Sequence, residues 1–436
     1  MISPGFTNAI RTGYMVDLLF LKEFKMNSKS LSNIYLFNPT CEYATANGNS
    51  SWQPNKLLTK MEEDMATLPL FFAKADDIVL VKQIPPAGYT ESLRLIGINP
   101  PHFYLLNSLS DNTGPVTKTA GWLLPWGWSP SAHRILSPLK QYCSEDFLNS
   151  PVSQWSSENR ELYSKKFAVE VQKVIISKLP REIMPSKYLE PAICSREDEI
   201  IPLIQKWGKL IIKAPWSTSG RGIQPITKLP VVRKVWEKIN GMIKQQGYVI
   251  VEPLLDKKSD MALQFKISGG KITYLGISRF FTDRKGQYQG NFLNGWPDHS
   301  DRETAFFVDS LPSVLTGPVI ETLEASGLGK LYEGHFGVDT LIFCMDNHRL
   351  KVNPCLEINF RYNMGLLSLT LEKFIKSDKQ GTFRIFYEKS KSFYDFTKEM
   401  ETRFPLKLKN KKIESGFFPL TPATEKSKFG AYMLVD

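Results

Sequence analysis

The sequence contains few of the residues that build disulfide scaffolds or transition-metal sites. Among its 436 residues are five cysteines and five histidines. The cysteines are odd in number and form no CxxC, and the histidines form no HxH or HxxxH pair. These absences argue against a disulfide framework and against a zinc site, and they lead us to expect a protein of the reducing cytoplasm.

Two further patterns are absent. No apolar run approaches the ~20 residues that cross a membrane. No block of lysine and arginine interleaves with aromatic residues, as it does in many nucleic-acid-binding proteins. We therefore expect neither a membrane nor a nucleic acid as a partner. A short basic run at residues 407–412 (KLKNKK) is expected to be a solvated loop.

What the chain does have is a surplus of positive charge. Its 55 lysines and arginines exceed its 44 aspartates and glutamates, for a net charge of +11. Such a surplus favours anionic partners such as nucleotides, phosphates or acidic substrates. A generic basic surface is the alternative interpretation.

The length predicts two or three domains. Residues 1–25 are interpreted as an extension outside the folded core, because their apolar stretch is interrupted by an acidic residue and no cleavage site follows it. Residues 26–157 alternate short apolar runs with helical periodicity, which is typical of an α/β domain with a parallel sheet. In this domain we expect a helix at 56–68, a rigid loop at 125–130, and strands at 34–37, 77–81, 93–98 and 102–106.

The pattern changes from residue 158 onward. Helices are expected at 156–178, 195–207 (capped by Ser195) and 231–246, and single strands at 209–213 and 248–252. Two antiparallel pairs follow, 260–268 with 271–281 across a Gly269-Gly270 turn, and 333–343 with 349–357. The tail, residues 371–436, has the pattern of a helix at 389–403 and strands at 416–420 and 429–435.

Residues 210–222 read LIIKAPWSTSGRG. Lys213 ends an apolar strand, where burying an unpaired ammonium group is costly, so we expect it to reach a phosphate or, alternatively, solvent. The loop after it provides hydroxyl groups, a guanidinium group and glycines that let backbone N–H groups approach a ligand closely. These residues are Ser217, Ser219, Gly220, Arg221 and Gly222. The loop has neither Walker A nor GxGxxG spacing, and a small polar turn is the alternative.

A second candidate segment lies at the end of the strand at 248–252. Glu252, Leu254 and Leu255 stand where backbone groups can contact the edge of an adenine ring and apolar side chains can flank it. Asp260, eight residues after Glu252, could accept hydrogen bonds from ribose hydroxyls. A structural role is the alternative for each of these residues.

Carboxylates inside apolar strands form the third candidate site. Asp339 lies in GVDTLIF and Glu357 in CLEIN, on strands that we expect to be neighbours. With Asn359 they provide an all-oxygen set, which suits a Mg²⁺ ion that bridges nucleotide phosphates. Arg361 is expected beside them, where it would stabilise charge on a transferring phosphoryl group.

These segments, in this order, resemble the ATP-grasp superfamily: a lysine strand, a Ser/Gly loop, an E-x-x-L hinge, a G-x-D strand and E-I-N-x-R. The resemblance covers residues 158–370. It implies a mixed α/β and α+β fold with two subdomains, 158–250 and 251–370, and ATP in the cleft between them. Residues 26–157 resemble the α/β pre-ATP-grasp domain. Most members activate a carboxylate as an acyl phosphate for attack by an amine or similar nucleophile.

The resemblance also implies a role for each nucleotide-binding candidate. Lys213 would contact the α- and β-phosphates, and residues 217–222 would cover the phosphates. Residues 252–255 would hold the adenine, and Asp260 the ribose. A second phosphate-binding lysine of the family would be Lys166, or else its neighbour Lys165.

For the metal and the chemistry, the resemblance implies that Asp339, Glu357 and Asn359 bind Mg²⁺, with Mn²⁺ possible in its place, and that Arg361 lies at the γ-phosphate. Arg279 and the loop expected at 288–291 (YQGN) could face the substrate, which makes Arg279 a second catalytic candidate, with a structural role as the alternative.

Three functions stay open at this point. The resemblance favours a ligase that joins a small-molecule or peptide carboxylate to an amine. A phosphotransferase that releases a phosphorylated product is the rival enzyme. The non-enzymatic alternative is a regulatory module that binds a nucleotide and does not turn it over.

Overall fold

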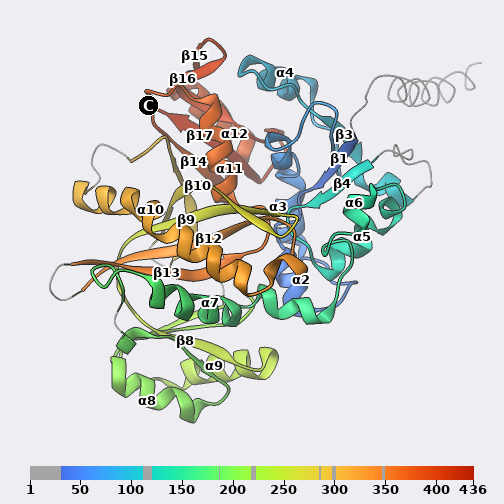
Figure 1. The fold of residues 1–436 in the computed structure, drawn as a ribbon. Helices are drawn as coiled ribbons and strands as arrows, with labels where there is room; N and C mark the ends of the chain where they lie inside the picture. Colours follow the sequence, from blue (N-terminus) through green and yellow to red (C-terminus); the bar gives the residue numbers. More distant parts are fainter. Residues whose placement is uncertain are drawn as a thin grey trace, which may run out of the picture.

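The structure is a computed structural model that describes residues 31–110, 120–185, 187–217, 222–283, 286–296, 301–345 and 349–436. Three β-sheets organise these residues (Figure 1). One sheet is parallel and the other two are antiparallel, which confirms the mixed α/β and α+β class expected from the sequence. Within the described ranges, no helix combines the length and the apolar character that crossing a membrane requires.

The N-terminal sheet is parallel, with the strand order β3-β2-β1-β4. Its strands are β1 (Ser32–Leu36), β2 (Ile78–Val81), β3 (His102–Leu105) and β4 (Ala120–Pro125). Three of them were expected and β4 was not. The helices of this region are α2 (Cys41–Asn47), α3 (Lys56–Asp64), α4 (Ala87–Leu95), α5 (Pro130–Lys140) and α6 (Glu145–Leu148).

The strand predicted at 93–98 is wrong, because these residues form the end of α4 and the turn after it. Tyr89, Leu93 and Ile96 are the buried apolar residues of the helix and its C-cap, and Ile98 is buried in the turn that follows. The first three are spaced by four and three positions, as on one helix face, whereas a strand would bury every second residue.

The helix predicted at 156–178 is divided in two. A 3₁₀ segment, η3 (Ser157–Tyr163), ends where Ser164 caps α7 (Lys165–Lys178), its Oγ accepting from the Phe167 amide at 3.4 Å. A serine hydroxyl satisfies one of the free N–H groups at a helix start, so a new helix begins there. This break places Lys165 at the first position of α7.

The small antiparallel sheet has the order β5-β8-β6-β7. Its strands are β5 (Ala192–Cys194), β6 (Leu210–Lys213), β7 (Ile223–Ile226) and β8 (Val249–Pro253), and α8 (Glu197–Trp207) and α9 (Arg233–Gln246) pack on it. In Figure 1 this unit lies apart from the large sheet, next to β13 and α7. The predicted cap of α8 is wrong: Arg196 is the N-cap, and the Ser195 amide donates to the Glu199 carboxylate at 2.7 Å.

The large sheet has nine strands in the order β13-β12-β9-β10-β11-β14-β17-β16-β15. Its first half is β9 (Asp256–Ser268), β10 (Lys271–Thr282), β11 (Tyr288–Leu293), β12 (Gly334–Cys344) and β13 (Leu350–Asn359). Both predicted antiparallel pairs, β9 with β10 and β12 with β13, are confirmed. Residues 288–291, expected as a loop, lie instead in β11.

The tail of the chain continues this sheet with β14 (Gly381–Tyr387), β15 (Lys407–Lys409), β16 (Lys412–Pro419) and β17 (Phe429–Val435). The basic run at 407–412 is therefore not a plain loop: it forms β15, a tight turn and the start of β16. The helices α10 (Arg302–Ala325) and α11 (Met364–Leu371) cover opposite faces of the sheet, and α12 (Phe393–Arg403) packs against β16. The domain boundaries expected from the sequence remain predictions.

A backbone junction joins the N-terminal sheet to the large sheet at the loop 125–130. The Trp126 amide donates to the Leu36 carbonyl, and the Tyr362 amide donates to the Trp126 carbonyl, both at 2.7 Å. Gly127 follows in this loop. A Cβ atom at Gly127 would collide with Sγ of Cys41 and approach Cβ of Arg361 to 3.1 Å. The junction therefore requires glycine at this position.

Gly127→Ala is expected to lower the free energy of unfolding by about 1–3 kcal/mol, because the added methyl group overpacks the junction. Denaturant unfolding measures this change. Gly241→Ala on α9, where an added Cβ meets nothing within 4 Å, is the matched control and is expected to be neutral or slightly stabilising. A Gly127→Ala protein as stable as the wild type would contradict the close packing of the junction.

Candidate functional site

The register of β12 and β13 brings two carboxylates together. Asp339 is the direct partner of Glu357 across the two strands, and Gly337 is the partner of Asn359. Directly opposed residues of an antiparallel pair project from the same face of the sheet. The structure therefore places Asp339, Glu357 and Asn359 on one face, as the sequence predicted for neighbouring strands.

The two carboxylates of this pair repel each other. The pKa of Asp339 is raised to about 7, chiefly by burial and also by the like charge of Glu357, against the opposing effects of Arg361 and of a hydrogen bond from Asn359. A divalent cation between the two carboxylates would relieve this repulsion. No group of three or more His, Cys, Asp and Glu side chains suited to a metal occurs among the described residues. Two carboxylates and a side-chain amide are nevertheless a suitable set of protein ligands for Mg²⁺, because this ion takes its other ligands from phosphates and water.

Lys165 holds Glu357 from the side of α7. Its Nζ lies 2.8 Å from Oε1 of Glu357 and donates to the Ser217 carbonyl, also at 2.8 Å. The side chain is only 7% exposed. Of the two lysines named from the sequence, the structure therefore brings Lys165 to the carboxylates. Lys166 turns away, with its Nζ 5.9 Å from the centre of the Tyr248 ring.

Lys213 forms a second buried ion pair, inside the small sheet. Its Nζ lies 2.6 Å from Oε2 of Glu252, and the two side chains are 10% and 9% exposed. The pairing follows from the fold, because β6 and β8 are neighbours in the sheet. Glu252 therefore neutralises the lysine at the strand end. This pairing explains why both charged side chains can be buried.

The loop after Lys213 returns to the strand within a few residues. The Ala214 amide donates to the Gly222 carbonyl at 2.9 Å. Gly222 has a φ of +76°, and a Cβ atom there would lie 2.7 Å from Cβ of Ser217, so the turn requires glycine. Ser219, Gly220 and Arg221 lie outside the described residues, and their predicted contacts with phosphate remain predictions.

Arg361 connects the carboxylate face to the N-terminal region. Its Nε lies 2.8 Å from Oε1 of Glu42 on α2, and its Nη2 donates to Oδ1 of Asn359 at 2.9 Å. Burial is the largest single influence on the pKa of Arg361 and would lower it, but the charge of Glu42, its hydrogen bond and the charges of Cys41 and Glu357 together outweigh burial, and the pKa is raised. The guanidinium group is thus held, fully charged, beside the predicted metal ligands.

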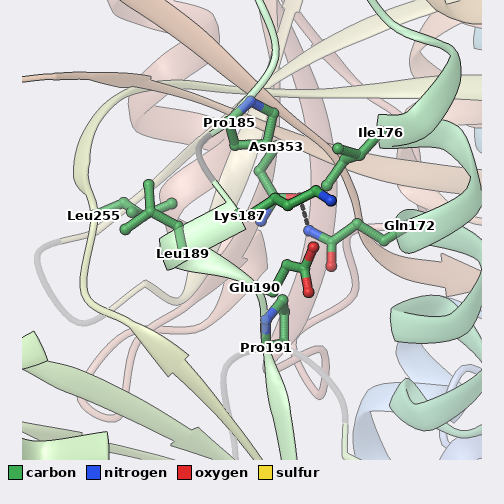
Figure 2. A pocket seen from close by; sticks show the side chains of 9 residues that line it. All are labelled: Gln172, Ile176, Pro185, Lys187, Leu189, Glu190, Pro191, Leu255 and Asn353. Atoms are coloured by element: carbon green, nitrogen blue, oxygen red, sulfur yellow. Dashed lines mark hydrogen bonds between the residues drawn. The ribbon is translucent and has the colours of Figure 1, made fainter. Parts of the chain in front are cut away.

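The two leucines of the predicted hinge, Leu254 and Leu255, have different surroundings in the structure. The Leu254 amide donates to the Lys209 carbonyl at 3.1 Å. This backbone N–H group, which was expected to contact adenine, is therefore already hydrogen-bonded. The Leu254 side chain is exposed. Leu255 lines a very small pocket, of about 10 Å³, with residues of α7, β13 and the loop before β5. Figure 2 shows this pocket, with Gln172 bonded to Asn353 behind it.

Asp260 is near the carboxylates but is engaged elsewhere. It accepts from Nζ of Lys257 at 2.6 Å and from Oγ1 of Thr282 at 3.2 Å. On β9 it lies two positions from Ala262, the direct partner of Asp339. It therefore shares the face of the carboxylates, and its predicted contact with a ribose remains a prediction.

Arg279 is not brought together with the other candidates. It lies between Ser278 and Phe280 on β10 and is the partner of Met261 on β9, so it projects from the face opposite to Asp260. There it binds Asp309 of α10, with Nη2 2.6 Å from Oδ1. This placement favours the structural alternative for Arg279 over the catalytic one.

Two contributors to the site were not predicted from the sequence. Glu42 is one of them. Arg160 is the other: its guanidinium group lies 4.0 Å from the centre of the Trp216 ring, and it donates to the Thr45 and Ala46 carbonyls at the end of α2. Trp216 directly precedes Ser217, so this contact connects the start of the loop at 217–222 to α2. Neither residue belongs to a local motif that could have identified it.

Lys213→Met is expected to destabilise the protein by about 3 kcal/mol or more, because it leaves the Glu252 carboxylate buried without its partner. The double variant Lys213→Met/Glu252→Gln removes both charges and is expected to recover most of this loss. Chemical denaturation of the wild type, both single variants and the double variant measures the coupling. If the double variant is as unstable as the sum of the two single variants, the pair is not coupled.

Asp339→Asn is expected to stabilise the protein without nucleotide, and more strongly at pH 8 than at pH 5. The folded-state pKa of Asp339, about 7, lies above its unfolded value of about 3.9. As the pH rises from about 3.9 to about 7, ionisation of Asp339 therefore lowers the stability of the wild type, and the loss is complete above about pH 7. In urea unfolding, the stability difference between Asp339→Asn and the wild type is expected to be about 2–3 kcal/mol larger at pH 8 than at pH 5. A difference that is independent of pH would contradict the raised pKa.

No protein-family model matches this sequence, and no curated protein matches it. Solved structures do match. Biotin carboxylase from Campylobacter jejuni, in its beta-gamma-ATP complex, is 13% identical, with 93% of this chain and 88% of that chain covered and a TM-score of 0.51. N5-carboxyaminoimidazole synthetase from Staphylococcus aureus, complexed with ADP, is 13% identical over 94% of each chain, with a TM-score of 0.48. A putative ATP-grasp superfamily protein from Archaeoglobus fulgidus has a TM-score of 0.40 at 13% identity, over 83% of this chain and 95% of that chain.

At this level of identity the likeness concerns the fold alone, and it rests on the biotin carboxylase match. Because that match covers 93% of this chain, it concerns the arrangement of the chain as a whole and not one sheet alone. The chain has the ATP-grasp fold.

Proposed function

We propose that this protein is an ATP- and Mg²⁺-dependent ligase that activates a carboxylate as an acyl phosphate for attack by an amine or a similar nucleophile. One observation carries the proposal. Lys165, the start of the phosphate loop at Ser217, and the carboxylate of Glu357 meet within hydrogen-bonding distance, although they come from three separate parts of the chain. A fold shared with an ATP complex of biotin carboxylase supports a nucleotide at this place.

The nucleotide would lie between the small sheet and the large sheet. Lys213 and Lys165 would supply positive charge to its phosphates, and the backbone N–H groups of residues 217–222 would donate to phosphate oxygens. In the structure, Lys213 is paired with Glu252 and Lys165 with Glu357. On binding, phosphates would join or replace these carboxylates as the partners of the two ammonium groups.

The metal ligands would be Asp339, Glu357 and Asn359. When bound there, Mg²⁺ would neutralise charge on the phosphates of the nucleotide. The same oxygen ligands would also suit Mn²⁺. Since Lys165 contacts Oε1 of Glu357, this carboxylate would lie between the ammonium group and such an ion. Asp339 would have to lose its proton at neutral pH, since its pKa is raised to about 7, chiefly by burial.

The reaction needs positioning and charge neutralisation more than acid–base chemistry. A carboxylate oxygen attacks the γ-phosphorus, the bond to the ADP oxygen breaks, and ADP leaves. The amine nitrogen then attacks the acyl carbon, inorganic phosphate leaves, and the nitrogen loses a proton. Arg361 would stabilise charge on the transferring phosphoryl group, and its ion pair with Glu42 would hold its orientation.

The direct experiment incubates the protein with ATP, Mg²⁺, mixtures of carboxylates and mixtures of amines, and measures ADP release and the mass of the products. A ligase requires both mixtures and yields a condensed product. A phosphotransferase yields a phosphorylated compound without any amine. A regulatory module binds nucleotide and releases no ADP, and this result would contradict the proposal.

Glu357→Gln is expected to reduce Mg²⁺-dependent ADP release at least 100-fold while the protein stays folded, because one carboxylate ligand is lost and the amide cannot neutralise the metal. Glu237→Gln, which removes a carboxylate from an exposed ion pair on α9, is the matched control and is expected to retain full activity. Near-normal turnover in Glu357→Gln would show that the metal ligands lie elsewhere.

A further inference from the structure

The structure has a cavity that none of the predicted site residues explains. It has a volume of about 470 Å³ and opens to solvent, and residues of α5, of α6 and of the segment 153–155 line it. Both helices pack against β4 of the N-terminal sheet (Figure 1). Small-molecule sites typically have volumes of ~300–1,000 Å³. The cavity is therefore large enough for a ligand, and its lining contains no candidate for a nucleotide, metal or catalytic role.

Lys140 brings a positive charge into this cavity. Its Nζ donates to Nδ1 of His133 at 3.0 Å and to the Ser153 carbonyl at 2.5 Å, and both acceptors are neutral. Partial burial lowers the pKa of Lys140, and no carboxylate of the described residues opposes this effect; only the Cys143 thiol does. An ammonium group carries three protons, so one proton of Lys140 remains for a ligand.

His133 adds a neutral donor next to this charge. Because an ammonium group can only donate, Nδ1 of His133 accepts, and the ring proton is assigned to Nε2. The pKa of His133 is lowered to about 3, chiefly by burial and also by the charge of Lys140, so the ring is neutral at physiological pH. Its Nε2–H group makes no hydrogen bond within the part of the chain that the structure describes. The cavity thus has two donors that can bind a ligand, and only one of them is charged.

Apolar side chains complete the lining. Trp155 follows α6 in the chain, and its ring centre lies 6.1 Å from that of His133 and 5.8 Å from that of Tyr163. These ring contacts hold the indole in place. Leu148, on α6, is 44% exposed although it is a large aliphatic residue. A ligand with an apolar body would remove exposed surface of both side chains from water, which favours binding.

The charge of the cavity indicates which anion it can hold. A carboxylate carries one negative charge, which Lys140 alone balances, and its two oxygens can accept from the ammonium and imidazole donors. A phosphate monoester carries a charge of about −1.5 to −2 at neutral pH. Part of that charge would lack a cation, because His133 is neutral and Lys140 is the charged residue of the lining. The cavity therefore suits a carboxylate better than a phosphate.

We propose that this cavity binds a small monocarboxylate, with the carboxylate on Lys140 and His133 and an aromatic or aliphatic body against Trp155 and Leu148. The site is separate from the proposed nucleotide site, since the two share no residue. The inference is also independent of the proposed ligase function, because binding at this place requires neither ATP nor Mg²⁺.

The first experiment titrates the protein, without nucleotide, with phenylacetate and with hexanoate in a calorimeter. Binding at millimolar concentration or below is expected, since ligands of this size gain limited affinity. Phenylacetamide, which has a similar shape without the charge, and phenyl phosphate are each expected to bind about 10-fold more weakly than phenylacetate. The proposal would be overturned if neither carboxylate binds, or if phenylacetamide or phenyl phosphate binds as tightly as phenylacetate.

The second experiment locates the bound phenylacetate. Lys140→Met removes the charged donor and is expected to weaken binding about 10-fold or more. Lys56→Met, which removes the same charge from an exposed position on α3, is the matched control and is expected to bind normally. Unchanged affinity in Lys140→Met would place the carboxylate elsewhere and would overturn the proposal.

A second pair of variants leaves Lys140 and its hydrogen bonds in place and decides the matter if Lys140→Met does not fold. Leu148→Glu introduces a carboxylate beside the cavity, and Leu148→Gln introduces a side chain of the same size without the charge. Both are expected to fold because Leu148 is exposed. Repulsion is expected to weaken phenylacetate binding about threefold or more in Leu148→Glu relative to Leu148→Gln. Equal affinities would contradict a carboxylate in this cavity.

A further control separates this inference from the proposed function. Addition of Mg²⁺ and a non-hydrolysable ATP analogue is expected to raise the melting temperature of the wild type and of Leu148→Glu by the same amount, since the cavity shares no residue with the nucleotide site. Binding of phenylacetate without this rise in the wild type would contradict only the proposed ligase function. A normal rise without binding of either carboxylate would contradict only the proposed cavity site.

Discussion

The repulsion between Asp339 and Glu357 is the constraint around which the rest of the site is arranged. The register of β12 and β13 fixes the two carboxylates opposite each other, and burial raises the pKa of Asp339. Such a pair is tolerated only with positive charge nearby. Lys165 and Arg361 supply it, the first by direct contact with Glu357 and the second through Asn359 and the field of its guanidinium group.

The same cations connect the parts of the molecule. Lys165 joins α7 to β13 and to the phosphate loop, and Arg361 joins the large sheet to α2 through Glu42. At the other end of α2, Arg160 donates to two helix carbonyls and stacks on Trp216, which directly precedes the loop at 217–222. The short helix α2 thus contacts groups on both sides of the proposed nucleotide site.

The sequence predicted those parts of the site whose signal is local. A lysine or a carboxylate inside an apolar strand stands out without a structure, and the neighbouring strands around Asp339 and Glu357 follow from their turn. Contacts between distant segments left no such signal: Glu42 is 319 positions from Arg361. The choice of Lys165 over Lys166 depends on the helix start at Ser164. The helix α10 was missed because two prolines lie inside it, and the side of the sheet that Arg279 faces could not be known before the register of β10.

The central claim is that the cleft binds ATP through Mg²⁺ at the paired carboxylates. Thermal unfolding with a non-hydrolysable ATP analogue, with and without Mg²⁺, tests it most directly, because a ligand that binds only the native state must stabilise it. The account predicts a rise of a few degrees that requires the metal and is absent in Glu357→Gln. A melting temperature that stays unchanged at millimolar nucleotide and Mg²⁺ would contradict it.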